Sequence, residues 1–151
     1  MHHLLAVILF ALSAYAIAQV EVKDAWVRST VPGSTTTAAY MSLHAQDNIK
    51  LFGASSPIAK TIELHKVSVD NNNVVRMRPI SELIIKNGET RVLKPGSYHF
   101  MLRDLNRELK VGEVVPLTLM IGQANGAFVD QKIDLRVEAA APQPADATMP
   151  H

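Results

Sequence analysis

Apolar and polar residues alternate over short stretches between residues 20 and 137, and turn-forming residues separate these stretches. Such spacing is typical of an all-β sandwich or barrel, and helical periodicity is weak throughout. A short helical turn is expected only at 57–60. The pattern predicts strands at 20–29, 37–45, 61–69, 74–79, 89–93, 98–102, 114–121 and 128–137.

Gly, Pro and Asn mark the breaks between these predicted strands. The Asp-Asn-Asn-Asn run at 70–73 lies between two of them, so we expect strands 61–69 and 74–79 to form an antiparallel hairpin. The other breaks contain Pro32-Gly33, Asn87-Gly88, Pro95-Gly96 and Asn125-Gly126.

The two ends of the chain differ from this central segment. An apolar run at 4–10 and the small residues at 16–18 predict a cleavable secretory signal over residues 1–18. An N-terminal membrane anchor is the alternative, but the run is shorter than the roughly 18 residues that a spanning helix needs. We therefore expect an exported protein with one β-sandwich domain at 19–138. Residues 139–151, rich in Ala and Pro, are expected to form a disordered tail.

Composition excludes several functions. The chain has no cysteine, which rules out thiol–disulfide exchange, a thiolate metal site and lipid attachment at an N-terminal cysteine. Its net charge is +1 with both signs interspersed, so neither nucleic-acid binding nor attraction to an anionic membrane is indicated. No stable membrane insertion is expected once the signal is removed.

The sharpest chemical pattern is His99-Phe100-Met101 within a predicted strand. Residues two apart share a strand face, so the imidazole and the thioether lie side by side while Phe100 faces the other way. The hairpin brings His65 and Met77 together, although alternation alone does not give their register. Two imidazoles and two thioethers can therefore converge.

Such a donor set favours Cu(I). Hard cations prefer oxygen ligands and zinc prefers thiolate, imidazole or carboxylate, whereas soft Cu(I) suits thioethers with neutral imidazoles. Taken singly, Met77 and Met101 are better explained by core packing, and His65 by an ordinary half-buried or surface position. Met120 is expected in the core and His44 in a structural or exposed role.

The spacing around these residues resembles a known family. His65-Lys66, ten residues, Met77, twenty-one residues and His99-x-Met101 is similar to the motif of the PCuAC family of periplasmic copper chaperones. The resemblance implies a cupredoxin-like Greek-key β-sandwich in the periplasm. It also implies one Cu(I), delivered to an acceptor such as the CuA site of cytochrome c oxidase or another copper chaperone, and bound by His65, Met77, His99 and Met101.

Two features of this chain bear on the comparison with members of the PCuAC family. Lys66 stands where many relatives have methionine, but alternation turns it away from the face of His65. Some relatives bind a second copper at a tail with His and Met, which makes Met149 and His151 a candidate weak second site. We expect a monomer.

The sequence is also compatible with competing functions. An exported immunoglobulin-like binding module would use the four residues only for packing and would take up no metal. A copper buffer or storage protein would bind Cu(I) without serving an oxidase. An enzyme is disfavoured, because neither a Ser-His-Asp arrangement nor paired carboxylates stand out.

Overall fold

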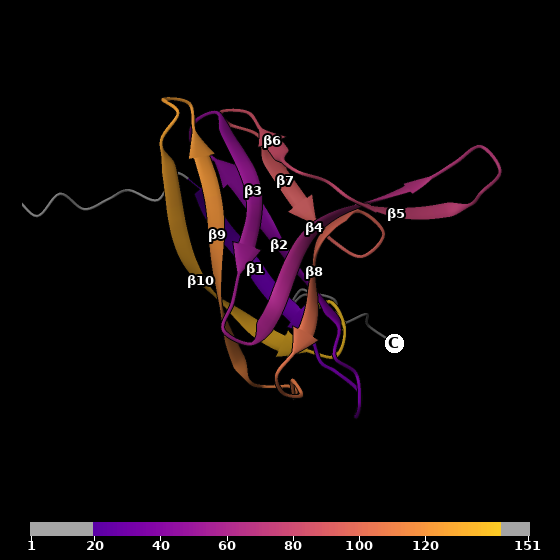
Figure 1. The fold of residues 1–151 in the computed structure, drawn as a ribbon. Helices are drawn as coiled ribbons and strands as arrows, with labels where there is room; N and C mark the ends of the chain where they lie inside the picture. The colour runs from indigo at the N-terminus through magenta and orange to yellow at the C-terminus, as the bar shows by residue number, and fades with distance from the viewer. Residues whose placement is uncertain (1–19, 143–151) are drawn as a thin grey trace, which may run out of the picture.

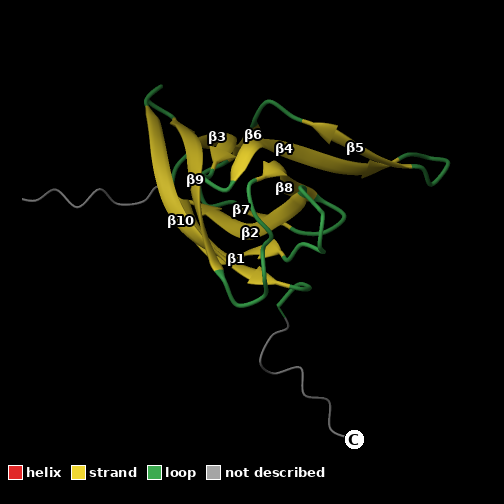
Figure 2. Ribbon diagram, turned by 60° about the horizontal axis from the view of Figure 1, so that its bottom comes forward, coloured by secondary structure: helices red, strands yellow, loops and turns green. Residues whose placement is uncertain are grey.

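A computed structural model describes residues 20–142, and these residues form β-strands joined by loops (Figures 1 and 2). The strands pair in the order β5-β4-β8-β2-β1-β10-β9-β3-β6, with β7 pairing β2 outside this path. Their bounds are β1 Val20–Arg28, β2 Thr37–Ala45, β3 Ile49–Ser55, β4 Ala59–Val69, β5 Val75–Pro79, β6 Leu83–Ile85, β7 Thr90–Leu93, β8 Tyr98–Leu105, β9 Val114–Gln123 and β10 Phe128–Glu138.

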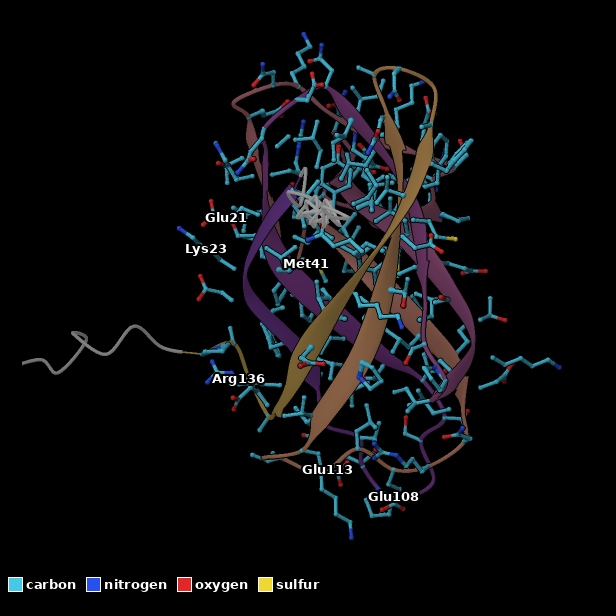
Figure 3. The ribbon with its side chains drawn as sticks, turned by 90° about the vertical axis from the view of Figure 1, so that its left-hand side faces the viewer. Glu21, Lys23, Met41, Glu108, Glu113 and Arg136 are labelled. Carbon is cyan, nitrogen blue, oxygen red and sulfur yellow. The ribbon has the colours of Figure 1, made fainter. Side chains whose placement is uncertain are left out.

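The sheet curls around one hydrophobic core. β3, near one end of the strand order, lies beside β4, near the other end (Figure 1). Alternate residues of each strand point into the enclosed space, where Met41 and Phe100 are among the largest fully buried side chains. Figure 3 shows Met41 between the strands, whereas Glu108 and Glu113 lie at one end of the molecule. The all-β, single-domain prediction is confirmed.

All eight predicted strands are present, with ends shifted by at most three residues. Two further strands, β3 and β6, were missed. β3 contains Gly53 at a register shift against β9, which interrupts the alternation, and β6 is only three residues long. The expected helical turn at 57–60 is wrong, because only Pro57 and Ile58 form a turn and β4 begins at Ala59.

Met120 lies outside the core on β9. It was expected in the core but is 39% exposed, because the alternation of β9 places Leu117, Leu119 and Ile121 inside and Met120 outside.

The chain ends are described only in part. The predicted signal at 1–18 and tail residues 143–151, with Met149 and His151, lie outside the described residues. Residues 20–142 contain no helix of the length and hydrophobicity that a membrane crossing requires.

Candidate metal site

His65 and His99 lie directly opposite each other on the paired strands β4 and β8. Their ring centroids are 5.4 Å apart, and each residue is only 3% exposed. Their neighbours Leu64 and Phe100 enter the main core, so alternation places both imidazoles on the opposite face of the sheet. The two histidines are therefore buried without belonging to the hydrophobic core.

Hydrogen bonds determine which nitrogen of each ring carries the proton. The carboxylate of Glu63 accepts a hydrogen bond from His65 Nε2 at 2.8 Å, and the carbonyl oxygen of Ser97 accepts one from His99 Nδ1 at 3.4 Å. These contacts leave His65 Nδ1 and His99 Nε2 as the lone-pair nitrogens, and both are buried without a hydrogen-bond partner. Two unpartnered acceptors on facing rings suit metal ligation, in which a carboxylate or carbonyl commonly orients the histidine.

Neighbouring groups and burial shift the pKa values of Glu63 and His99. The hydrogen bond from His65, and then the charge of Arg103, hold the pKa of Glu63 below its usual range. Arg103 Nε lies 3.3 Å from the same carboxylate oxygen that contacts His65. Burial lowers the pKa of His99, which therefore stays uncharged near pH 7.

Met101 extends the site along β8. It shares a face with His99 two residues before it and lies opposite Glu63 on β4. Its side chain is half-buried and lines a hollow of about 320 Å³ together with Arg28 and Tyr40. A thioether therefore lies next to the two imidazoles at a partly open surface.

Met77 occupies the same face but a different environment. It pairs with Val67 on β4, so it is a diagonal neighbour of His65, and the predicted hairpin is confirmed. Met77 is 50% exposed because β5 and the adjoining end of β4 project from the body of the molecule (Figure 1). The structure thus brings His65, His99 and Met101 together on adjacent strands and places Met77 beside them on an exposed edge.

A metal ion at this site would need sulfur ligands as well as the two imidazoles. Within residues 20–142, no three His, Asp or Glu side chains come close enough together to hold a metal ion. The donors that the register places on one face are two imidazole nitrogens and two thioethers, a neutral and soft set that fits Cu(I).

An aromatic row beside the site was not found from the sequence. The rings of Trp26 and Tyr40 are 4.7 Å apart, and Tyr40 lies 6.1 Å from His99. A β-bulge between Lys23 and Trp26, with Asp24 at a φ of 52°, shifts Trp26 onto this face. Simple alternation cannot locate a bulge, so the sequence did not reveal the row.

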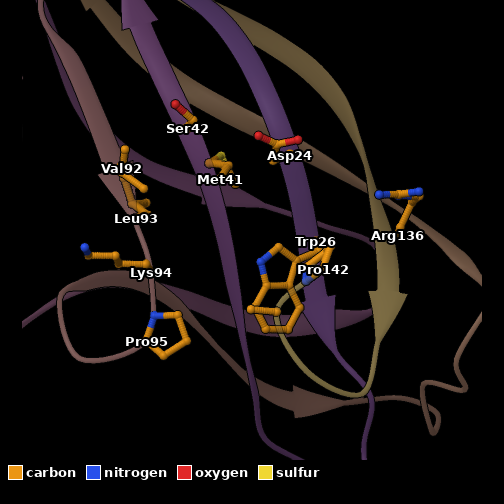
Figure 4. A pocket seen from close by; sticks show the side chains of 11 residues that line it. Asp24, Trp26, Met41, Ser42, Val92, Leu93, Lys94, Pro95, Arg136 and Pro142 are labelled. Atoms are coloured by element: carbon orange, nitrogen blue, oxygen red, sulfur yellow. The ribbon is translucent and has the colours of Figure 1, made fainter. Parts of the chain in front are cut away.

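Beyond Trp26 lies an open pocket of about 460 Å³ (Figure 4). Pro95, Pro142 and Arg136 contribute to its lining, and none of the four candidate ligands does. The pocket is therefore separate from the candidate metal site.

The two other residues weighed earlier lie away from the four candidate ligands. Lys66 lies on the opposite face from His65, as expected, with its Nζ 5.8 Å from the centre of the Tyr98 ring. His44 is half-buried, and its Nδ1 lies 2.8 Å from the Thr90 hydroxyl. Glu63, by contrast, shares the face of His65 at a spacing of two residues, a signal that was visible in the sequence.

Comparison with known proteins places the chain in a family. The family described as putative lipoprotein LpqE-like matches residues 20–133. The putative lipoprotein Lxx21020 of Leifsonia xyli subsp. xyli (strain CTCB07) is 29% identical over 100 residues, which cover 66% of this chain. The match spans 60% of the length of that relative.

Solved structures share the fold. Apo-DR1885 from Deinococcus radiodurans is 28% identical with a TM-score of 0.59, covering 93% of this chain and 95% of its own. The CuI-DR1885 structure gives the same identity and TM-score and covers 85% of this chain and 82% of its own. The copper-bound PCuAC domain from PmoF2 has a TM-score of 0.64 and covers 83% of this chain and 97% of its own. Its sequence identity of 21% means that the match shows a shared fold alone.

The family match covers most of the described residues, and the match to apo-DR1885 covers 93% of the chain. The chain has the PCuAC-type fold that the resemblance of its sequence to the PCuAC family implied, and it belongs to the LpqE-like family.

Proposed function

We propose that this protein is a copper chaperone that binds one Cu(I) through His65, Met77, His99 and Met101 and passes it to an acceptor protein. The observation that carries the proposal is the pair of buried nitrogens, His65 Nδ1 and His99 Nε2, that lack hydrogen-bond partners on two rings whose centroids lie 5.4 Å apart. The copper-bound PmoF2 domain and CuI-DR1885, which are structures of similar fold, support it.

Exposure of the ligands suggests the order in which they release copper. Met77 is half exposed on an edge strand, whereas both histidines are buried. An incoming acceptor thiolate reaches the metal from the Met77 side and displaces this thioether first. Copper then moves to the acceptor, because thiolate is a stronger donor for Cu(I) than a neutral thioether. The CuA site of cytochrome c oxidase is one acceptor of this kind.

A cell-envelope location fits this function. The family and the curated relative are both described as putative lipoproteins, which supports an exported protein, and we propose the periplasm after cleavage of residues 1–18. The 151 residues contain no cysteine to which a lipid could be attached. We propose a monomeric carrier without catalytic activity.

Cu(I) titration against a competing chromophoric chelator tests the ligand set. We expect one equivalent to bind, with large losses of affinity in His65→Ala, His99→Ala and Met101→Ala and a smaller loss in Met77→Ala, whose side chain is the most exposed. His44→Ala and Met120→Ala remove the same residue types elsewhere and serve as matched controls. Undiminished binding in all four ligand variants would refute the site.

The rate of Cu(I) transfer to an acceptor distinguishes the competing functions. A chaperone gives up its Cu(I) to a dithiol acceptor within seconds to minutes of mixing, whereas a storage protein retains it. The binding-module hypothesis predicts no Cu(I) uptake at all. Truncation after Ala141 tests Met149 and His151, since loss of a second, weaker equivalent identifies the tail as its site.

A further inference from the structure

Residues 66–79, here called the hairpin arm, form a projecting and internally ordered element (Figures 1 and 2). At its tip, Asp70 N donates to the carbonyl oxygen of Val74 at 3.0 Å. The Asp70 carboxylate accepts hydrogen bonds from the backbone N–H groups of Asn72 and Val74 at 2.9 and 3.0 Å. The arm is therefore a defined hairpin and not a loose loop.

One face of the hairpin arm is apolar and continues from the metal site. Cross-strand pairing places Val67 opposite Met77 and Val69 opposite Val75, on the same face as His65. Val69, Val75 and Met77 are 62%, 66% and 50% exposed. An uncovered apolar strip thus leads directly to the candidate ligand that is most open to solvent.

The other face of the hairpin arm is basic. Lys66 lies directly opposite Arg78, and Ser68 lies opposite Arg76. Among residues 20–142 no carboxylate forms an ion pair with Lys66 or Arg78, whereas Arg76 is paired with Asp70 at 3.3 Å. Like charges directly opposite each other destabilise a strand pair. Lys66 and Arg78, two cations without a carboxylate partner on this face of the arm, are a local cost that a partner of opposite charge would offset.

We propose that the hairpin arm is the docking surface for the copper acceptor, and that the acceptor presents acidic side chains around an apolar patch. This inference rests on the proposed copper-carrier function. The apolar strip lies on the face of the arm from which copper leaves Met77. The cations Lys66 and Arg78, on the other face of the arm, select and orient an acidic surface. Charge complementarity of this kind raises association rates more than affinity.

Two other occupants fit the hairpin arm less well. An anionic membrane is usually bound by clusters of four to eight cations, and the arm carries three, one of them already paired with Asp70. A second copy joined edge to edge along β5 would bring Arg76 and Arg78 of both copies close together. It would also meet Pro79, which has no N–H to donate.

Two synthetic probes test the docking proposal. Both are fluorescein-labelled peptides with a Cys-x-x-x-Cys centre flanked by valines. One also carries glutamates, and the other carries glutamines at the same positions. Anisotropy measures docking on the copper-free protein, and stopped-flow mixing measures Cu(I) transfer from the loaded protein. We expect the glutamate probe to dock more tightly and to take copper about tenfold faster, with the advantage shrinking from about 0.01 M to about 0.15 M salt.

Matched variants assign this preference to the hairpin arm. K66Q/R78Q should remove the advantage of the glutamate probe while leaving the equilibrium Cu(I) affinity unchanged. K110Q/K132Q removes the same charge from exposed positions off the arm and should keep the advantage. V69S/V75S should slow transfer to both probes, because it removes the apolar strip that they share. Circular dichroism checks that each variant is folded.

The outcomes separate the two proposals. Equal docking and transfer for both probes, or no effect of K66Q/R78Q, would overturn the docking surface. So would stronger binding to phosphatidylglycerol vesicles than to the glutamate probe, or dimerisation that K66Q/R78Q enhances. A protein that binds no Cu(I) but still docks the glutamate probe through Lys66 and Arg78 would refute the copper function and leave the docking surface standing.

Discussion

The tautomer of each buried histidine is set by one neighbouring oxygen, and the Glu63 carboxylate is the one that mutation can remove. In Glu63→Ala, His65 loses the acceptor that fixes its proton on Nε2, so the ring can turn or change tautomer. Loss of such an orienting partner typically weakens a metal site by about 10–100-fold. We expect a loss of this size in the Cu(I) titration.

Glu63→Gln is the control for this effect, because its amide oxygen can still accept the hydrogen bond from His65. It should retain more affinity than Glu63→Ala. Unchanged Cu(I) binding in Glu63→Ala would mean that His65 does not depend on this contact.

His99 makes stability and copper binding depend on pH in the same direction. Burial lowers the pKa of His99 in the folded protein, whereas in the unfolded chain it takes up a proton near its usual pKa of about 6.5. The unfolded state therefore binds more protons below that pH, and the free energy of unfolding falls as the pH drops from about 6.5 toward the lowered pKa. Above about 6.5 the contribution of His99 is fully present.

Urea unfolding of the copper-free protein at pH 7.5 and pH 5.5 measures this dependence. The drop in stability should be smaller in His99→Gln than in the parent, and His44→Gln is the matched histidine control. Cu(I) affinity should also weaken over this range, because protons compete for His99 Nε2. A flat affinity profile between pH 7 and pH 5 would contradict neutral imidazole ligation.

The turn of the hairpin arm depends on a single carboxylate. Backbone hydrogen bonds, that from Val74 first, keep the pKa of Asp70 below its usual range, so the carboxylate is ionised at neutral pH. Asp70→Ala should fray the tip and speed amide exchange at Asn72 and Val74 by about tenfold or more, since each lost bond contributes about 1 kcal/mol. Hydrogen exchange followed by NMR measures the effect.

Asn72→Ala is the matched control in the same turn, because its side chain makes none of these hydrogen bonds. Global unfolding should change little in either variant, since the hairpin arm lies outside the hydrophobic core. Equal exchange rates in the parent and Asp70→Ala would show that the turn does not need the carboxylate.

Copper should stabilise the whole molecule because its candidate ligands lie on three adjacent strands, β5, β4 and β8. A ligand that binds only the folded state adds about 4 kcal/mol when its free concentration is a thousand times its dissociation constant. Differential scanning calorimetry under reducing conditions should therefore show a higher Tm with Cu(I). His65→Ala/His99→Ala should show no such increase, and an equal increase in that variant would place the stabilising copper elsewhere.

The sequence predicted most of the architecture because one face of nearly every strand is buried, which imposes alternation. It failed where geometry breaks that rule. Gly53 interrupts β3 at a register shift, and Asp24 creates the bulge that moves Trp26. The candidate ligands followed from local spacing and family resemblance. The direct opposition of His65 and His99 depends on strand register across thirty-four positions, which alternation does not encode.

The bulge at Asp24 makes β1 tolerant of a one-residue deletion. Before it, Val20 and Val22 pack toward the core; after it, Val27 does so while Trp26 faces Tyr40. Removing Asp24 would leave Ala25 opposite Met41, keep Trp26 opposite Tyr40 and keep Val27 in the core. In a regular strand the same deletion would exchange the inner and outer faces, whereas here the aromatic row beside His99 would survive it.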